Sequence, residues 1–360
     1  MYETALQVLK KINNQGYISY IVGGYPRDLC IHRESIDIDI CTNATPKDLK
    51  EIFKDSILSQ EQYGSVTLKY NNIHFEITTF RKEIKYKDNR FPIKIKYIND
   101  LLEDLKRRDF TINTLCIDEN GKYVDLLNAK EDIDKQIIRT VGNSDLKIKT
   151  DIFRSLRAIR FATILNFKLE EKLKKSIKKY GRLLKKLSYE RKKEELDKIF
   201  TNQNAIYGIQ LINELNLAKY LDLRKMNKIV ATTTSIGIWA QFDVEKIYPF
   251  TRQEKNLIKN IKEALNVDIL NCHNLYKYGL YISTIVGEIK EISREKIVRL
   301  YNDLTIKNIG DIDITANEIC QTLNKKPGPF LKILYGDLEN KILDGNLINY
   351  KENIIAYILN

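Results

Sequence analysis

The spacing of apolar residues changes once along the chain, near residue 145, and this change constrains the fold more than any other feature. Before it, short apolar runs with alternating polar residues predict strands separated by short helices. After it, almost every apolar run recurs at helical spacing, and strand signals disappear. We therefore predict an α+β fold, in which a mixed N-terminal part precedes an all-helical remainder. At 360 residues, the chain is long enough for several cores.

Basic residues outnumber acidic ones, with 60 Lys and Arg against 48 Asp and Glu, which gives a formal net charge of +12. This balance favours a polyanionic partner, with nucleic acid ahead of a membrane, although a chain rich in Lys, Ile and Asn carries such a charge without any functional reason. No apolar run is long enough to cross a bilayer, and the N-terminus reads as an amphipathic helix rather than a signal peptide. The five cysteines are scattered without a CxxC pair, which fits a reducing cytoplasm and predicts neither disulfides nor a zinc site.

The first part of the chain contains separate strand, turn and helix signals. We predict, in chain order, a helix at 2–15, a strand at 17–22, a Gly-Gly turn, a helix at 26–32 and a strand at 36–41. Hairpin turns are expected at Asn71-Asn72 and at Asn120-Gly121. The polar segment 82–98 between the two hairpins is expected to be a mobile loop.

Two aspartates follow a glycine pair at close spacing. Alternate side chains of a strand share a face, so Asp37 and Asp39 point the same way, and the neighbouring isoleucines point into the core: Ile36, Ile38 and Ile40. Two such carboxylates repel unless a cation lies between them, and hard oxygen ligands favour Mg²⁺. Upstream, Gly23 and Gly24 let backbone N–H groups approach a phosphate. Either pattern alone is ordinary structure, but their spacing, with Arg27 in the intervening helix, predicts metal-assisted phosphoryl transfer from a nucleoside triphosphate.

A basic segment, KRRDFTIN at 106–113, joins a predicted helix to a predicted strand. Guanidinium groups bind phosphate oxygens in a forked geometry, and Arg108 is the residue expected to hold the triphosphate. The alternative is a solvated basic helix end, where cations are favoured by the helix dipole in any case. The residues of this segment alone leave the two interpretations evenly matched.

The segment 150–162 predicts a helix that carries one carboxylate and three guanidinium groups at three-residue spacing. These residues are Asp151, Arg154, Arg157 and Arg160. Cytosine and adenine each present an exocyclic amine beside a ring nitrogen acceptor, whereas uracil and guanine present a carbonyl beside an N–H. A carboxylate that accepts from the amine and an arginine that donates to the ring nitrogen therefore select C and A. Asp151 and Arg154 form such a pair. The alternative is that these four charged residues lie on a plain surface helix.

Four motifs together resemble those of the class II tRNA nucleotidyltransferases, the bacterial and eukaryotic CCA-adding enzymes that share a head with bacterial poly(A) polymerases. They are GGYPRD with DIDI, KRRDFTIN, DIFRSLRAIRFA and SYERKKEELDKI, in the family's order and spacing. The C-terminal segment KKPGPFLKILYGDLENKILDGNLINYKE also resembles the tail of the bacterial enzymes. The resemblance implies a nucleotidyltransferase head of the DNA polymerase beta superfamily at 1–140, a helical neck at 141–200, and a helical body and tail that bind tRNA at 201–360.

The resemblance also implies roles for individual residues. Asp37 and Asp39 match the catalytic, metal-binding carboxylates of the family. Gly24, Arg27 and Arg108 match its contacts to the triphosphate. The amino-acid template that holds the incoming CTP and then ATP matches the four residues of the predicted helix: Asp151, Arg154, Arg157 and Arg160.

Three positions qualify the resemblance. The template motif often begins with glutamate, whereas this chain has Thr150, which affects at most a supporting contact. The superfamily usually offers a third metal carboxylate, for which Glu76 is a candidate, although a glutamate at the core edge paired with a lysine explains it equally well. Segment 82–98 falls on the family's flexible loop, which is associated with the switch from C to A addition, and keeps a DNRFP sequence.

The activity that the resemblance implies is template-independent addition of CCA to the 3′ end of tRNA from CTP and ATP. Two Mg²⁺ ions held by Asp37 and Asp39 are expected to activate the tRNA 3′-hydroxyl and to neutralise the pyrophosphate leaving group. The expected enzyme is cytoplasmic, a monomer or homodimer, and binds tRNA rather than a membrane. The rival interpretations are an enzyme that adds only CC or only A, a poly(A) polymerase, a catalytically silent RNA-binding protein and a helical adaptor.

Overall fold

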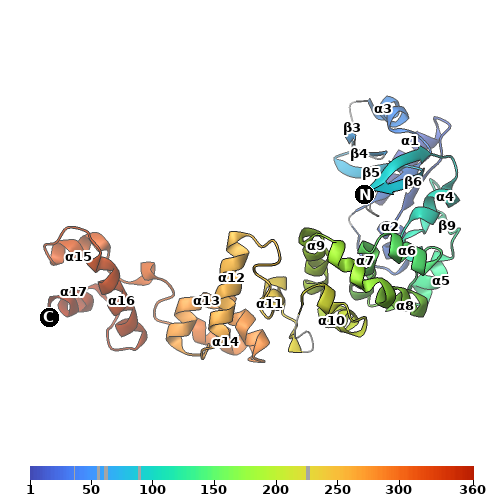
Figure 1. Cartoon of the computed structure of the whole chain (residues 1–360). Helices are drawn as coiled ribbons and strands as arrows, with labels where there is room; N and C mark the ends of the chain where they lie inside the picture. The colour runs from blue at the N-terminus through green and yellow to red at the C-terminus, as the bar shows by residue number, and fades with distance from the viewer. Residues whose placement is uncertain (36, 55–56, 61–63, 88–90, 224–227) are drawn as a thin grey trace. The chain divides into compact units, whose positions relative to one another are not determined.

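The computed structural model describes residues 1–360 with the exception of 36, 55–56, 61–63, 88–90 and 224–227 (Figure 1). The described residues divide into two compact units, Met1–Asp222 and Leu223–Asn360. Every strand lies in the first unit, among the parts of the chain that the structure describes, so the predicted α+β class is confirmed. Within the same parts, no helix is both long and apolar enough to cross a membrane.

A mixed sheet forms the centre of the head. Its described residues form seven strands in the order β3-β4-β5-β2-β1-β8-β9. In chain order, the strands are β1 (Ser19–Val22), β2 (Asp39–Thr42), β3 (Ile57–Gln60), β4 (Ser65–Tyr70), β5 (Ile73–Thr79), β8 (Cys116–Ile117) and β9 (Tyr123–Val124). Neighbouring strands are antiparallel except β2 and β5, which run parallel. Because β2 has a partner on each side, its backbone has little freedom to move.

Two helices, α1 (Tyr2–Asn13) and α3 (Pro46–Phe53), pack on the sheet. The apolar residues of α1 recur every three or four positions and are fully buried: Ala5, Val8, Leu9 and Ile12. They share one core with Ile21 of β1 and Ile40 of β2. A third helix, α2 (Gly24–Cys30), follows β1 directly. The core therefore supports the end of β1 and the start of β2, where the predicted carboxylates lie.

Both predicted hairpins are present. Asn71 and Asn72, which join β4 to β5, have φ of 49° and 61°, as a two-residue turn of type I′ requires. The hairpin of β8 and β9 turns within 118–122, as expected.

The expected loop at 82–98 is wrong, because β6 (Arg81–Lys87) and β7 (Phe91–Tyr97) form an antiparallel ribbon of their own. The segments KEIKYK and IKIKY alternate lysine with apolar residues at a period of two, which is a strand pattern despite the polar composition. Pro92 pairs with Tyr86 in this ribbon, whereas Asp88 and Arg90 of the DNRFP sequence lie outside the described residues.

The remaining helices of the first unit are short. In chain order they are α4 (Leu101–Arg107), the 3₁₀ turn η2 (Thr111–Asn113), α5 (Ala129–Asp134), α6 (Ser144–Thr150), α7 (Phe153–Leu165), α8 (Glu171–Tyr180), η3 (Gly181–Lys186), α9 (Tyr189–Phe200), α10 (Ala205–Glu214) and η4 (Ala218–Tyr220). Of these, α4 and η2 come before the last two strands of the sheet. Two strands of two residues each, β10 (Ile137–Ile138) and β11 (Lys168–Leu169), form a parallel pair. This pair connects the segment before α6 with the segment after α7. The expectation that strands end near residue 145 is therefore wrong for β11.

Helix α7 packs against both α9 and α10. The contact with α10 is so close that a Cβ on Gly208 would lie 2.5 Å from Thr163 of α7 and 2.5 Å from Ile199 of α9. These helices hold α7 firmly beside the head.

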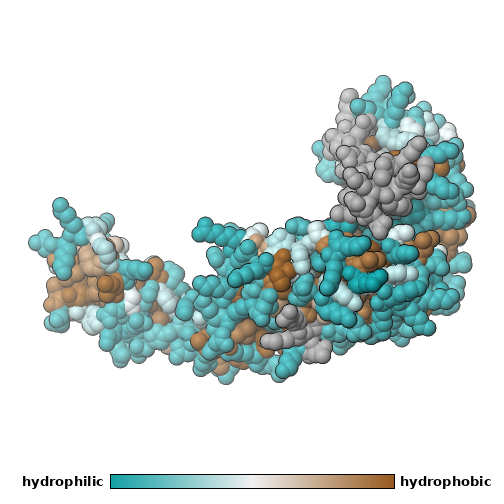
Figure 2. Space-filling view, in the orientation of Figure 1, coloured by the Kyte–Doolittle hydropathy of each residue, from teal (hydrophilic) through white to brown (hydrophobic). Residues whose placement is uncertain are grey.

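Helices are the regular secondary structure of the second unit within its described residues, as predicted. It contains α11 (Ser235–Trp239), α12 (Arg252–Leu265), α13 (Cys272–Ile289), α14 (Arg294–Asn302), η6 (Ile309–Asp311), α15 (Ala316–Thr322), α16 (Phe330–Leu343) and α17 (Lys351–Leu359). Figure 2 shows hydrophobic residues on the visible face of its C-terminal part. Ile333 of α16 is 77% exposed, and Ile348, between α16 and α17, is 68% exposed.

Helix α13 is interrupted at Gly279, whose φ of 70° and ψ of 170° are not helical. Before this break, His273 contacts Asp344 at 2.7 Å and Tyr276 packs on the C-terminal core that α15–α17 share. After it, Glu288 accepts hydrogen bonds from Thr233, in the segment that leads into α11. The two halves of one helix therefore belong to two different packing environments.

Candidate active site

A cleft of about 530 Å³ collects most of the predicted residues in the first unit. Seven arginines and three aspartates line it, with two glycines, two phenylalanines and one asparagine: Arg27, Arg81, Arg107, Arg108, Arg154, Arg157, Arg191, Asp39, Asp109, Asp151, Gly23, Gly24, Phe153, Phe161 and Asn113. Of the nine residues predicted from the sequence, Asp37 and Arg160 are not among the lining residues. The excess of positive charge suits a polyanion such as a triphosphate.

The glycine turn lies against the carboxylate strand. Gly23 has a φ of 86° and a ψ of −128°, a conformation that residues with a Cβ rarely adopt. A Cβ at this position would lie 3.1 Å from Oδ2 of Asp39. Val22 is paired with Asp39 in the β1–β2 ladder, which brings the turn and the carboxylate together. Glycine is thus required at position 23 both by the backbone conformation and by the contact with Asp39. The family resemblance assigned a triphosphate contact only to Gly24.

The start of β2 brings the carboxylate-bearing residues Asp39 and Glu76 side by side, with Asp37 two residues before Asp39 in the chain. Ile38 and Ile40 are buried, and Asp37 and Asp39 lie on the opposite, open face, as the strand pattern predicts, while Ile36 lies outside the described residues. Asp39 pairs in register with Glu76 on the parallel strand β5.

The carboxylate of Asp39 has more negative than positive side chains around it. Burial raises its pKa to about 6, repulsion from Glu76 and Asp37 adds to this effect, and Arg108 opposes it. No lysine forms an ion pair with Glu76 in the described part of the chain, so the structural alternative for this residue has no support there. Nor are three potential metal ligands of the described residues already gathered into a ready-made site. The donor set, which consists of hard carboxylate oxygens that repel one another, fits a divalent cation around which the side chains close.

Arg27 is locked in the floor of the cleft. Its side chain donates to Asp28 Oδ1 from Nε at 2.9 Å and from Nη2 at 2.8 Å, and Nη1 donates to Asn113 Oδ1 at 2.6 Å. Burial lowers the pKa of the guanidinium, and the carboxylate of Asp28 opposes this shift. Such a rigid cation can support a phosphate group without paying for reordering when a ligand binds.

Arg108 follows the last residue of α4 and lies 3.5 Å from Oδ2 of Asp104. Its Nε is buried and has no hydrogen-bond partner within the described residues. A buried donor without a partner is costly unless a ligand or water satisfies it. Arg108 is therefore suited to bind an anionic ligand in this cleft.

The predicted template residues do not share one helix face. Asp151 precedes α7, because its φ of −145° and ψ of 96° are extended, and its Oδ1 accepts a hydrogen bond from the N–H of Phe153 at 3.1 Å. Asp151 therefore begins the helix instead of lying on it, and the prediction of four residues on one helix is wrong at this position. Its carboxylate and the guanidinium of Arg154 both line the cleft.

The three arginines that the resemblance assigns to the template are held by different partners. Arg154 donates from Nη1 to the carbonyl oxygen of Lys147 at 2.9 Å and to Thr150 Oγ1 at 3.4 Å. Arg157 forms a paired contact with Oδ2 of Asp109, at 2.8 Å from Nε and 2.7 Å from Nη2.

Arg160 donates from Nε to Glu195 Oε2 on α9 at 2.7 Å and lies 4.2 Å from the ring centroid of Phe161. Its ion pair with Glu195 is almost fully buried, and Arg160 does not line the cleft. Arg160 thus joins α7 to α9, whereas Asp151 and Arg154 are placed to meet a ligand.

Sequence reasoning missed several residues of the cleft. The ring of Phe161 has three guanidinium groups near its face, from Arg27, Arg157 and Arg160. Arg191 stacks on Phe153, with 3.8 Å between its Cζ and the ring centroid. The motif SYERKKEELDKI contains Arg191 and Glu195 and was the one available signal for both.

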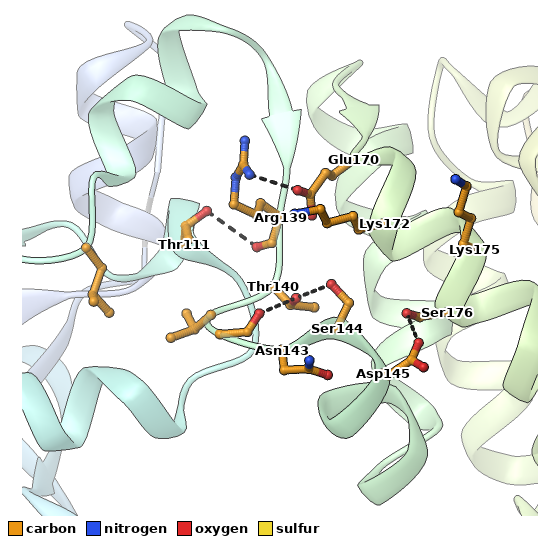
Figure 3. Close-up of a pocket in the computed structure, with 13 residues that line it drawn as sticks. Thr111, Arg139, Thr140, Asn143, Ser144, Asp145, Glu170, Lys172, Lys175 and Ser176 are labelled. Carbon is orange, nitrogen blue, oxygen red and sulfur yellow. Dashed lines mark hydrogen bonds and ion pairs between the residues drawn. The ribbon is translucent and has the colours of Figure 1, made fainter.

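A second cavity, of about 560 Å³, lies between β10, α6 and α8 (Figure 3). Its charged side chains largely satisfy one another: Arg139 contacts Glu170 at 2.8 Å, and Asp145 accepts from Ser176 and Lys179 at 2.5 Å each. The hydroxyl oxygens of Thr140 and Ser144 are 2.8 Å apart. This cavity contains none of the predicted site residues.

Comparison with known proteins identifies the family of the chain. Three family models match the chain: "Poly A polymerase head domain" at residues 19–139, "Probable RNA and SrmB- binding site of polymerase A" at 166–224, and "tRNA nucleotidyltransferase domain 2" at 246–358. A head of this class generally uses divalent metals.

The similarity to individual proteins extends over the whole chain. The CCA-adding enzyme of Bacillus cereus (strain AH820) is 34% identical over 389 residues, covering 99% of this chain and 98% of the relative. The Bacillus stearothermophilus CCA-adding enzyme in complex with CTP has a TM-score of 0.84 and 26% identity, covering 99% of this chain and 96% of that one. The fold is also that of the Thermotoga maritima CCA-adding enzyme complexed with tRNA, with a TM-score of 0.74, 20% identity and coverage of 99% and 94%. The chain therefore belongs to the class II CCA-adding enzymes of the tRNA nucleotidyltransferase and poly(A) polymerase family.

Proposed function

We propose that this chain adds C, C and A in turn to the 3′ end of tRNA, takes CTP and ATP as substrates, and releases pyrophosphate. The observation that carries the proposal is the cleft that brings a carboxylate of the Asp-Ile-Asp strand together with Asp151 and Arg154. The relatives that match along nearly the whole chain are named CCA-adding enzymes, and one solved relative is in complex with CTP.

Asp37 and Asp39 are the catalytic carboxylates in this proposal, and Glu76 is the candidate for a third. Their hard oxygens, and the raised pKa of Asp39 that burial and Glu76 cause, support Mg²⁺ as the cation. When bound, Mg²⁺ supplies a lowered pKa at the tRNA 3′-hydroxyl and offsets the charge of the departing pyrophosphate. We assign the three carboxylates to orienting the reacting groups, and the pairing of β2 with β5 keeps Asp39 beside Glu76.

The triphosphate is assigned to the cations and to the glycine turn. Arg108 is the main contact, because it enters the cleft beside Asp39 with a buried Nε available for a new hydrogen bond. Arg27 supports the phosphates from a fixed position, and Gly24 leaves space for their approach at the start of α2. Arg107 and Arg191 line the same cleft and add to its positive charge.

Base selection is assigned to Asp151 and Arg154. The carboxylate accepts from the exocyclic amine of C or A, and the guanidinium donates to the adjacent ring nitrogen. Uracil and guanine leave both groups unpaired in a partly buried site, which costs more than a missing contact in water. In our proposal Arg157 and Arg160 take the supporting part of the template, because each already has a carboxylate partner.

The remaining assignments concern the domains and the RNA. We assign 1–140 to the catalytic head, 141–200 to the neck that carries the template, and 201–360 to the body and tail. The positive net charge of +12 supports tRNA bound along the helical part and read by the shape of its backbone. We place this activity in the cytoplasm, with a monomer or a homodimer as the working form.

The test is incorporation into tRNA that ends before its CCA. CTP alone is expected to extend this tRNA by two nucleotides, CTP with ATP by three, and ATP alone by none. Asp39→Asn and Asp37→Ala are expected to abolish all extension without a change in the circular dichroism spectrum. Extension that stops at CC, addition of A only to a tRNA that already ends in CC, or long A-tails on unrelated RNA would each replace CCA addition by a rival activity.

A further inference from the structure

The side chain of Lys147, in α6, connects this helix to the segment that carries Arg108. Its Nζ donates to the carbonyl oxygens of Lys106 and Arg108, each at 2.8 Å. These carbonyls lie at the end of α4, where the last carbonyls of a helix lack partners within the helix and attract a cation. Lys147 thus caps α4 although it is about forty residues away in the chain.

The main chain of the same residue holds the base-reading arginine. The carbonyl oxygen of Lys147 accepts from Nη1 of Arg154 at 2.9 Å and from Oγ1 of Thr150 at 3.2 Å. Thr150 also accepts from Nη1 of Arg154 at 3.4 Å. An arginine side chain has many rotamers, so these contacts are what keeps its guanidinium at one place in the cleft.

A second bridge runs parallel to the first one. Asp109, next to Arg108, pairs with Arg157, one helical turn after Arg154. The pKa of Asp109 is lowered although burial acts to raise it, because Arg157 and the N–H of Phe110 favour the ionised form. The segment 106–109 is therefore joined to α6 through Lys147 and to α7 through the pair of Asp109 with Arg157.

We propose that Lys147 is a positioning residue that fixes the distance between the triphosphate contact at Arg108 and the base contact at Arg154. This inference rests on the proposed function of the cleft. Lys147 is not among the residues that line the cleft, so it acts through its two neighbours and not on the nucleotide. A nucleotide whose phosphates are held by Arg108 then presents its base at the position where Asp151 and Arg154 discriminate.

The test compares Lys147→Met, which keeps the apolar stem and removes the ammonium group, with Lys149→Met on the same helix. Lys149 is exposed and forms no hydrogen bond or ion pair within the described residues, so it is the matched control. Lys147→Met is expected to lower kcat/KM for CTP about ten- to a hundredfold and to raise the share of UTP that is incorporated. Lys149→Met is expected to stay within about twofold of the parent chain, and Lys147→Arg, which keeps a cationic donor, to recover most of the loss.

Hydrogen exchange of the ligand-free protein gives a readout that does not depend on activity. Lys147→Met is expected to speed the exchange of backbone amides in 106–113, whereas Lys149→Met leaves it unchanged. Unchanged exchange in Lys147→Met, or unchanged CTP selectivity in an active enzyme, overturns the positioning role. If the parent chain adds no nucleotide to tRNA, the proposed function fails, and the exchange result alone decides whether Lys147 joins the two segments.

A milder variant covers the case in which Lys147→Met does not fold. Thr150→Val removes the hydroxyl that contacts both the Lys147 carbonyl and Arg154 while keeping the size of the side chain. It is expected to lower kcat/KM for CTP about threefold and to increase UTP incorporation, because the guanidinium of Arg154 loses one of its two contacts. The proposal is contradicted if Thr150→Val adds C and rejects U with the same efficiency as the parent chain.

Discussion

Substitution of Gly23 by alanine tests how closely the carboxylate of Asp39, which we propose to be catalytic, must be placed. Two costs follow from the structure. The first is backbone strain, because a φ of 86° with a ψ of −128° is reserved for glycine, and a residue with a Cβ there costs about 1–3 kcal/mol. The second is contact: the new methyl group would lie 3.1 Å from Oδ2 of Asp39, a few tenths of an ångström closer than ordinary packing allows.

The carboxylate of Asp39 has to move to relieve the close contact with the new methyl group. Asp39 is paired with Val22 on one side and with Glu76 on the other, so its backbone cannot retreat and its side chain must rotate instead. Metal–ligand distances tolerate changes of only about 0.2 Å, and a misplacement of about 1 Å in a reacting group can cost about a hundredfold in rate. We expect Gly23→Ala to lower the rate of C addition about tenfold to a hundredfold at saturating CTP.

Gly16→Ala is the matched control. Gly16 has a similar φ of 84°, but no atom lies within 4 Å of the Cβ that it would acquire. It should therefore lose stability without losing activity in the folded fraction. The assay is the initial rate of C addition to tRNA lacking CCA over a range of Mg²⁺ concentrations, corrected by the folded fraction from thermal unfolding. If both variants retain the same activity per folded molecule, the contact with Asp39 has no catalytic consequence and the reasoning is refuted.

Three further predictions concern stability. Gly208→Ala should cost about 1–3 kcal/mol by overpacking the α7–α10 contact, whereas Gly336→Ala, in an open position of α16, should gain about 0.5–1 kcal/mol; two thermal midpoints that shift in the same direction contradict the packing argument. Glu195→Gln leaves a buried arginine without its counter-charge and should cost about 1.5–3 kcal/mol in urea unfolding of the first unit; an unchanged midpoint would show that the pair contributes nothing. The hydrogen bond from Lys351, with further bonds at Thr315, lowers the pKa of Glu318 to about 2. The ionised carboxylate therefore stabilises the second unit fully above about pH 4.5, and this stabilisation is lost as the pH falls toward 2. Glu318→Gln should flatten this acid dependence in a pH series of melting curves, and an unaltered profile would contradict the assignment.

Local patterns were sufficient for much of the head. The two-residue alternation of Asp37 and Asp39 with buried isoleucines, and the asparagine pair at 71–72, are rules of a single strand and a single turn, and the structure follows them. The ribbon of β6 and β7 was missed because lysines at every second position made a strand pattern look like a polar loop.

The pairing of distant residues was beyond such rules. Three-residue spacing placed Asp151 on the helix with Arg154, but the chain is extended at Asp151 and the helix begins two residues later, at Phe153. Spacing also treated the template arginines as equivalent, whereas Arg160 is neutralised by Glu195, 35 residues away. Such partners depend on how α7 packs against α9, which no local pattern contains.

The break in α13 at Gly279 has a consequence for how the C-terminal part of the chain can change in evolution. In an unbroken helix, one inserted residue rotates everything beyond it by about 100°, which turns an apolar face away from its partner. At Gly279 the backbone leaves the helical conformation, so the two halves of α13 are not bound to one helical register. No atom lies within 4 Å of the position that a Cβ on Gly279 would take. A residue can therefore be inserted or lost beside Gly279 while Tyr276 stays on the C-terminal core and Glu288 stays on Thr233. The length of the chain between the two packing environments is free to vary at this one point of α13.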